Sequence, residues 1–200
     1  MRNPAGRLLL AVVLVAVCSP ALLAQSTGAA IKSVMPRVVK IFGAGGIRGL
    51  HAYGTGFLVS AEGHIITVWS HVLDTDEVTV VLSNGRRFEA KVLGAEPQLD
   101  LAVLKLKEDE LSLPFFDLKE ATSAGPGTRI LGFSNMFKVA TGAEPVSVLH
   151  GVIAGRTKLT ARRGAYEVPY DGDVYVVDAI TNNPGAGGGV ITTLDGKLLG

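Results

Sequence analysis

The sequence predicts an all-β fold made of two six-stranded antiparallel β-barrels that follow one another along the chain. Two sets of short strand-like segments, separated by a polar linker, are the first observation. The second is that short turns rich in glycine or asparagine join neighbouring segments, as antiparallel strands require. The third is a hydrophobic content of 48% with 18% charged residues, which supplies a core and excludes a disordered chain.

The charge balance limits the classes of partner. Nineteen Lys and Arg residues against eighteen Asp and Glu residues leave a formal net charge of +1. Nucleic-acid binding usually needs a strongly basic surface, so we expect no nucleic-acid partner. No histidine pair has metal-ligand spacing, and the glycine-rich segment Gly43–Gly46 lacks the Lys-Ser/Thr of a phosphate-binding loop. We therefore expect neither a metal nor another cofactor.

Residues 1–25 have the pattern of a secretory signal peptide. Arg2 and Arg7 supply the basic start, and an unbroken apolar run over Leu8–Val17 follows. The run is too short to span a bilayer as a helix, and small residues follow Pro20. We expect an exported protein that meets the membrane only through this segment before cleavage. An uncleaved membrane anchor is the alternative.

Cleavage after this segment would remove Cys18, the only cysteine. The mature protein would then contain no disulfide bond, although it is exported. Small extracellular domains often depend on disulfides, so their absence favours the bacterial periplasm or cell envelope. We expect that location.

Residues 26–118 are predicted to hold an N-terminal segment and the first barrel. A weak helical period over Ala29–Val39 comes first, and Pro36 ends it. Tight turns are expected at residues 61–63 and 83–85, where Ala-Glu-Gly and Ser-Asn-Gly separate apolar runs. The six expected strands are Val38–Phe42, Thr55–Ser60, His64–Trp69, Glu77–Leu82, Arg86–Leu93 and Leu101–Leu106.

Residues 119–200 are predicted to form the second barrel, after a polar linker over Lys107–Pro126. The clearest strands are Arg129–Phe133, Pro145–Ala154, Asp173–Asp178 and Val190–Thr193. A turn over Leu194–Lys197 leaves a returning strand of only three residues. We therefore expect the second barrel to be incomplete at its C-terminal end.

Two residues of the first barrel stand at strand ends where chemistry can occur. His71 follows one predicted strand, and Asp100 opens another. Taken singly, each residue type is common at strand ends and turns. Together in one barrel, they supply a base and a carboxylate that can orient its imidazole ring.

The surrounding segments resemble the HtrA/DegP family of trypsin-like serine proteases. Gly54–Val59 reads GTGFLV, like the Gly-Ser-Gly-Phe strand of that family. Gly63–Val72 is similar to its Gly-Tyr-Ile-Leu-Thr-Asn-Asn-His-Val, with one extra residue before the histidine. Asp100–Lys105 resembles the aspartate strand closely, and Leu131–Asn135 resembles the Ile-Gly-Asn-Pro segment less well. The resemblance runs from about Ile31 to Gly200.

The resemblance implies a trypsin-like fold with an active site in the cleft between the barrels. It assigns His71 as the general base and Asp100 as the residue that orients it. It also implies that extended or unfolded polypeptides bind in the cleft and that the protein assembles as a homotrimer.

The same resemblance points to a missing nucleophile. The family motif Asn-Pro-Gly-Asn-Ser-Gly-Gly-Pro aligns without a gap to NPGAGGGV at Asn183–Val190, so the serine position is Gly187. The N–H groups of Gly185 and Gly187 would form the oxyanion hole. Glycine has no side chain, so no acyl-enzyme can form at this position. Ala186 and Val190 also depart from the motif.

Three functions remain open from the sequence. The first is a catalytically inactive serine protease homologue, a pseudoprotease that keeps a peptide-binding cleft in the cell envelope. The second is an active serine endopeptidase of envelope protein quality control whose nucleophile lies elsewhere. The third is a structural or scaffold domain that no longer binds peptides. The ungapped glycine frame around position 187 favours the first and third over the second.

Overall fold

The computed structural model describes residues 27–43, 52–75, 77–163 and 166–200. The predicted signal peptide, residues 1–25, lies outside these ranges. Within them, every helix is too short or too polar to cross a lipid bilayer. Side chains of residues 159–171 are likewise outside the description.

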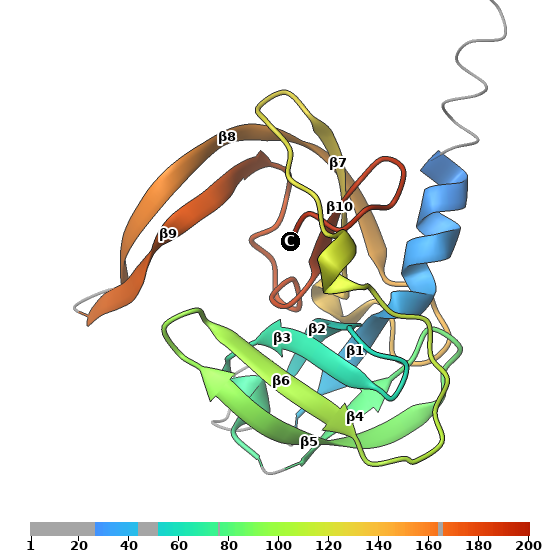
Figure 1. The fold of residues 1–200 in the computed structure, drawn as a ribbon. Helices are drawn as coiled ribbons and strands as arrows, with labels where there is room; N and C mark the ends of the chain where they lie inside the picture. The colour runs from blue at the N-terminus through green and yellow to red at the C-terminus, as the bar shows by residue number, and fades with distance from the viewer. Residues whose placement is uncertain (1–26, 44–51, 76, 164–165) are drawn as a thin grey trace, which may run out of the picture.

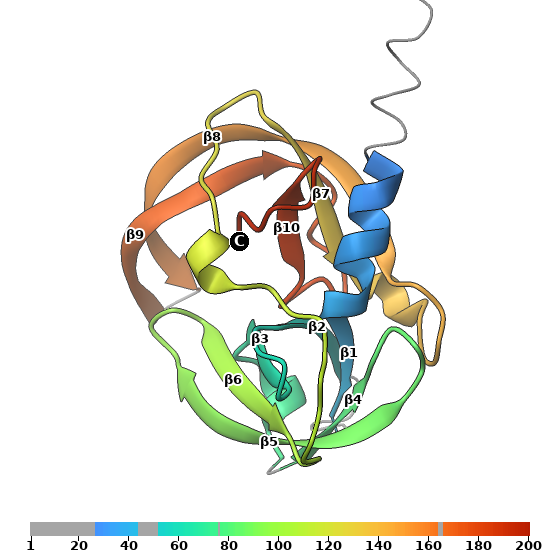
Figure 2. The same ribbon diagram turned by 45° about the vertical axis from the view of Figure 1, so that its right-hand side comes forward.

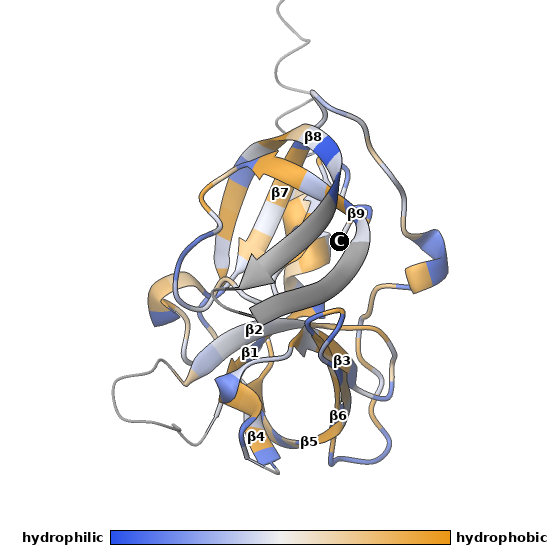
Figure 3. Ribbon diagram, turned by 90° about the vertical axis from the view of Figure 1, so that its left-hand side faces the viewer, coloured by the Kyte–Doolittle hydropathy of each residue, from blue (hydrophilic) through white to orange (hydrophobic). Residues whose placement is uncertain are grey.

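Six antiparallel strands close into a barrel in the order β1-β2-β3-β6-β5-β4 (Figure 1). The all-β class and the six-stranded first barrel predicted from the sequence are confirmed. Viewed end-on, the strands form a ring with hydrophobic residues along its wall (Figure 3). The strands are β1 (Val38–Phe42), β2 (Tyr53–Leu58), β3 (His64–Val68), β4 (Glu77–Val81), β5 (Arg87–Glu96) and β6 (Leu101–Leu106).

Alternation along the strands fills the interior of this barrel. On β6, Ala102, Leu104 and Leu106 are buried, whereas Leu101 and Val103, which alternate with them, are exposed. This period of two is what a strand with one core face and one outer face requires. The turns that the sequence predicts join β2 to β3 and β4 to β5, with positive φ angles of 90° at Gly63 and 83° at Gly85.

The second unit is a four-stranded antiparallel sheet in the described residues, where the sequence predicts an incomplete six-stranded barrel. Its order is β10-β7-β8-β9. β8 and β9 form a long curved hairpin that extends beyond the other two strands (Figure 1). The strands are β7 (Arg129–Ser134), β8 (Ser147–Arg163), β9 (Tyr166–Asp178) and β10 (Val190–Thr193).

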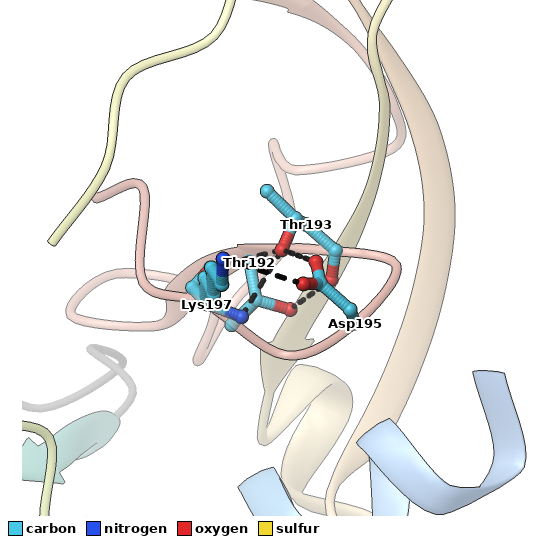
Figure 4. A network of polar contacts seen from close by, with 4 residues as sticks. All are labelled: Thr192, Thr193, Asp195 and Lys197. Atoms are coloured by element: carbon cyan, nitrogen blue, oxygen red, sulfur yellow. Dashed lines mark hydrogen bonds and ion pairs between the residues drawn. The ribbon is translucent and has the colours of Figure 1, made fainter. Parts of the chain in front are cut away.

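A polar network fixes the turn that follows β10 (Figure 4). The Thr193 hydroxyl donates to the Asp195 carboxylate and accepts the Lys197 backbone N–H at 3.1 Å. The turn sends the chain back along β10, where Leu198 pairs with Thr192 and the Leu199 N–H donates to the Ile191 carbonyl at 2.9 Å. The short returning segment thus lies beside the edge of the sheet.

An N-terminal helix over residues 27–34 lies against the second unit and leads through a short 3-10 helix, η1 (Met35–Arg37), into β1 (Figure 2). Ala30 and Val34 lie on its buried side, four residues apart, as one helix face requires. Val34 packs with Phe116 and Leu198 in a cluster that also contains Phe57 of the first barrel. This cluster joins the two units.

A buried lysine ties the loop before β8 to the first barrel. Lys40, on β1, is 1% exposed, and its Nζ donates to the carbonyls of Gly142 at 2.5 Å and Glu144 at 3.1 Å. Burial lowers the pKa of Lys40 from its ordinary value, while the nearby Glu144 opposes that shift. Arg87 adds a bond from Nη2 to the Thr141 carbonyl at 2.8 Å.

The Glu144 carboxylate gives this loop a dependence on pH. Its Oε2 accepts the N–H groups of Thr141 at 3.1 Å and Gly142 at 2.6 Å, and these bonds hold the pKa of Glu144 below its ordinary value of 4.5. Because the folded state lowers this pKa, the stabilisation is fully present above pH 4.5 and is lost as the pH falls through the folded-state value.

Glu144→Gln is therefore expected to flatten the acid side of the stability profile. Thermal melts from pH 7 to pH 2.5 should show the wild type losing more melting temperature than the variant. Glu108→Gln, which removes another exposed carboxylate, is the control and should follow the wild type. Parallel profiles for wild type and Glu144→Gln would contradict the assignment.

Candidate functional site

A pocket of about 370 Å³ opens between the first barrel and the segment that precedes β10. It brings together three of the four site residues expected from the sequence, namely His71, Gly185 and Gly187. Asp100 is not among the residues that line it. The lining residues are Ile41, Tyr53, Gly54, Thr67, Val68, Ser70, His71, Val72, Leu73, Asn183, Pro184, Gly185 and Gly187.

His71 reaches the pocket because it opens a 3-10 turn at the end of β3. This turn, η2 (His71–Leu73), follows Ser70, whose backbone is extended. Val72 and Leu73 are buried in the core of the first barrel and anchor the turn there. The imidazole of His71 is left half-buried at the rim of the barrel, on the wall of the pocket.

Asp100 lies close to this segment through the backbone but not through its side chain. The Asp100 carbonyl accepts the N–H of Trp69 at 3.0 Å, two residues before His71. Asp100 itself is exposed in the turn before β6, with φ at 55°. No hydrogen bond joins its carboxylate to the His71 imidazole, so the structure does not bring these two expected partners together.

The loop over residues 183–189 consists of two consecutive tight turns. The Ala186 N–H donates to the Asn183 carbonyl at 3.0 Å, and the Gly189 N–H donates to the Ala186 carbonyl at 3.0 Å. The N–H groups of Gly185 and Gly187, on either side of Ala186, have no acceptor among the residues that the structure describes. Two peptide donors therefore remain available at residues that line the pocket.

Two glycines of this loop are required by its shape. Gly185 and Gly188 have φ angles of 84° and 77°, in the left-handed region. A Cβ atom would lie 2.2 Å from the Asn135 carbonyl oxygen at Gly185, and 2.1 Å from the Thr55 carbonyl oxygen at Gly188. Any side chain at either position would force the backbone of the loop to move.

Gly187 differs from these two glycines. Its φ lies outside the left-handed region, the residue is exposed, and a Cβ atom there would meet only Val68, with Cγ1 at 3.0 Å. The backbone at position 187 therefore admits an L-amino acid if Val68 shifts by a few tenths of an ångström. Val68 is one of the three residues between Thr67 and His71 that make this stretch one residue longer than the motif it resembles.

Thr55, on β2, holds the loop in place. Its hydroxyl is fully buried, donates to the Gly185 carbonyl at 2.6 Å and accepts the Asn135 N–H at 2.8 Å. Its carbonyl accepts the hydroxyl of Thr67 at 2.6 Å. In the sequence, Thr55 stands out only as the threonine between two glycines in the Gly54–Val59 motif.

Asn135 supports the loop from the second unit. It is fully buried, its Nδ2 donates to the Ala140 carbonyl at 2.9 Å, and its Oδ1 accepts the Ala140 N–H at 3.0 Å. These bonds close the segment after β7, which includes the 3-10 turn η4 (Met136–Lys138). From that turn the Phe137 N–H donates to the Pro184 carbonyl at 2.9 Å.

Thr55→Val is expected to lower the free energy of unfolding by about 2–4 kcal/mol, because it leaves the Gly185 carbonyl and the Asn135 N–H buried without partners. Chemical denaturation of the purified protein measures this. Thr55→Ser keeps the hydroxyl and should lose less than half as much. A valine variant as stable as the wild type would show that the hydroxyl does not hold the loop.

The chemistry available in this pocket is one imidazole, the hydroxyls of Tyr53, Thr67 and Ser70, the amide of Asn183, two peptide N–H donors and apolar walls. No aspartate, glutamate, lysine or arginine is among its described lining residues. Across the described residues, no three His, Cys, Asp or Glu side chains gather closely enough to hold a metal ion. The arrangement suits a ligand that offers a hydrogen-bond acceptor, or a negative charge, next to an apolar group.

Comparisons with known proteins point to one family. The profile of the trypsin-like peptidase domain matches residues 54–200. A probable periplasmic serine endoprotease, DegP-like, from Chlamydia pneumoniae is 32% identical over 147 residues, which are 74% of this chain and 28% of that protein. Its counterpart in Marinomonas sp. (strain MWYL1) is 31% identical over 149 residues, again 74% and 28%. The chain spans little more than a quarter of the length of these relatives.

Solved structures give the same fold. An HtrA-type protease determined with a tripeptide superposes with a TM-score of 0.70 and 26% identity, over 87% of this chain and 52% of that one. The MamO protease domain from Magnetospirillum magneticum has a TM-score of 0.64 and 24% identity, over 84% of both chains. The first likeness supports kinship as well as fold, and the second supports the fold alone.

Proposed function

Because this chain belongs to the trypsin-like peptidase family, as a homologue of the HtrA/DegP serine endoproteases, we propose that it is a member without a nucleophile whose cleft binds polypeptides without cutting them. The observation that carries the proposal is the absence of any hydroxyl at Gly187. This residue lines the same pocket as His71, inside a loop whose other glycines are required by its shape.

The tight fit of the loop supports the alignment of Gly187 with the serine. Gly185 and Gly188 are held against Asn135 and Thr55 at distances that exclude side chains. A shift of the frame by one residue toward the C-terminus would put Gly188, with a φ of 77°, at the nucleophile position. In a serine protease, removal of the serine costs on the order of 10⁶ in kcat.

The position of Asp100 supports inactivity independently. In a Ser-His-Asp protease the carboxylate fixes the tautomer and orientation of the imidazole, and its loss costs on the order of 10⁴ in kcat. Here the Asp100 carboxylate is exposed and is not bonded to His71. The expected Ser-His-Asp arrangement is therefore incomplete at Asp100 as well as at Gly187.

The expected partners and location form part of the proposal. Extended or unfolded polypeptides are the ligands, because the relatives are named endoproteases and the pocket offers peptide donors beside apolar walls. The periplasm or cell envelope is the compartment, since the relatives are named periplasmic and residues 1–25 have the pattern of a signal peptide. Assembly as a homotrimer rests on the family resemblance.

The test combines a covalent probe with a binding assay. The protein lacking residues 1–25 should show no labelling by a fluorophosphonate and no casein cleavage above background, yet it should bind fluorescent, unfolded casein. Ser70→Tyr, which places a ring in the pocket, should weaken binding, whereas Ser112→Tyr, at an exposed site outside the pocket, should not. Wild-type labelling at a mapped residue would identify a nucleophile and favour the active endopeptidase. Absence of binding would favour the scaffold function.

A further inference from the structure

A second pocket, of about 490 Å³, lies between the N-terminal helix with η1, residues 116–122 of the linker and the turn after β10. It shares no lining residue with the pocket that contains His71. Its volume is within the range of small-molecule sites. The charged side chains that line it are those of Arg37, Asp117, Glu120, Asp195 and Lys197.

Arg37 brings a cation without a counter-ion to this pocket. It ends η1, is half-buried, and its Cζ lies 5.0 Å from the centroid of the Phe116 ring. Its Nε is buried without a hydrogen-bond partner, and no carboxylate pairs with the guanidinium among the ion pairs of the described residues. A partly buried charge in this state costs free energy until an acceptor binds it. The planar guanidinium suits the two oxygens of a carboxylate.

The aromatic ring beneath Arg37 is held in place. Phe116 is 2% exposed, and its ring meets that of Phe57 edge-on, with 6.0 Å between the centroids and 82° between the planes. The Phe116 N–H donates to the Leu58 carbonyl at 2.9 Å. A cation is attracted to the face of an aromatic ring, so this fixed ring holds the guanidinium at the pocket before a ligand arrives.

Hydrogen bonds also fix the wall that the linker contributes. Asp117 Oδ1 accepts the Lys119 N–H at 2.9 Å and caps the 3-10 turn η3 (Leu118–Glu120). The Thr122 N–H donates to the Leu198 carbonyl at 2.9 Å and ties the linker to the segment that returns along β10. The pocket is therefore formed by the fold itself, and little ordering is needed when a ligand binds.

The carboxylates of the pocket indicate what else the ligand must carry. Asp195 accepts the Thr193 hydroxyl and lies 3.8 Å from Lys197 Nζ (Figure 4). Glu120, exposed at the end of η3, has no cation beside it among the ion pairs of the described residues. Three carboxylates against two cations line the pocket, and like charges repel. A ligand with a positive group as well as a carboxylate is therefore favoured over a simple anion.

We propose that this pocket binds a small zwitterion, namely a free amino acid or a short peptide with both ends unblocked. The carboxylate of the ligand binds the Arg37 guanidinium, and its ammonium group binds the Glu120 carboxylate. An amino acid and a dipeptide offer the same two charged ends and differ in the distance between them. The inference goes beyond the proposed function, because the site is separate from the polypeptide cleft and either can fail without the other.

The decisive comparison needs only the wild-type protein and isothermal titration calorimetry. The probes are alanine and dialanine, each also with its amine acetylated or with its carboxylate converted to the amide. Hydrogen bonds between charged groups are the strong ones, so each blocked form should bind at least about tenfold more weakly than its parent. Tighter binding of alanine identifies the amino acid as the ligand, and tighter binding of dialanine identifies the short peptide. Equal binding of blocked and unblocked forms, or binding of neither zwitterion, would overturn the inference.

Two variants assign the two ends of the ligand. Arg37→Gln should weaken binding of the zwitterion at least about tenfold and leave binding of its amide unchanged, a difference that a general loss of structure would not produce. Glu120→Gln, at an exposed site, should abolish the advantage of the free amine over the acetylated form. Arg86→Gln, which alters an exposed arginine stacked on Phe88 outside the pocket, is the matched control and should change neither.

The outcomes separate this site from the proposed function. Unchanged zwitterion binding in Glu120→Gln and in folded Arg37→Gln would overturn the assignment of the pocket. If Arg37→Gln does not fold, Glu120→Gln decides alone. Casein binding by the wild type tests the polypeptide cleft separately, and Glu120→Gln should leave it unchanged.

Discussion

Gly187→Ser should make the protein reactive toward fluorophosphonates, at a rate far below that of an active serine protease. The φ angle at position 187 lies outside the left-handed region, so serine fits the backbone, but its Cβ would lie 3.0 Å from Val68 Cγ1. Gly187→Ser/Val68→Ala removes that crowding and should be labelled faster. A misplacement of about 1 Å can cost on the order of 10² in rate. The labelling rate of the double variant is therefore the more informative measurement.

The restored rate should remain low because Asp100, the residue expected to orient the His71 imidazole, is exposed in the turn before β6 and does not line the pocket. Asp100 is not bonded to His71, and loss of this partner costs on the order of 10⁴ in a Ser-His-Asp protease. Adding His71→Ala to Gly187→Ser/Val68→Ala should abolish labelling, since the serine needs its base. If neither serine variant is labelled while both are folded, the assignment of Gly187 to the nucleophile position is wrong.

Gly188→Ala should destabilise the protein by about 3 kcal/mol or more. Alanine at φ 77° costs about 1–2 kcal/mol on its own. Its Cβ would also lie 2.1 Å from the Thr55 carbonyl oxygen and 2.4 Å from the Thr67 hydroxyl, so the loop must move away from β2. Overpacking of this kind adds about 1–3 kcal/mol.

The neighbouring glycine provides the matched control for that experiment. Gly187→Ala meets only a valine methyl group and has an ordinary φ, so its effect should stay below about 1 kcal/mol. Denaturant unfolding of both variants measures the difference. Equal losses at the two positions would show that the loop is not fixed by the contacts of Gly188 with β2.

The first barrel could be predicted closely because the sequence signals for its strands and turns lie within short segments of the chain. Alternation of apolar residues and the turns at Gly63 and Gly85 located its strand ends to within three residues. The β8–β9 hairpin was predicted too short, since Thr157–Arg163 is largely polar and lacks an alternating apolar face. Pairing with β9 makes this stretch a strand, and that pairing joins residues far apart in the sequence.

Prediction of the site has the same limit, because contacts between residues far apart in the sequence leave no local pattern. A resemblance located the segments that carry His71 and Gly187, which line one pocket. Asp100, which the resemblance also assigns, is exposed in the turn before β6 and does not line the pocket. The contacts of Thr55 with Asn135 and Gly185 left no pattern in the sequence, since each is a single bond between distant segments.

The bonds of the Thr55 hydroxyl also have a consequence for the time course of folding. They join residues 130 and 80 positions apart in the sequence. Contacts at such separations are slow to form, because the chain must lose loop entropy before they are made. The first barrel consists largely of neighbouring hairpins and can fold earlier, whereas the pocket exists only after the second unit has docked. In pulse-labelling hydrogen exchange, amides of β4 and β5 should gain protection before those of residues 135 and 189.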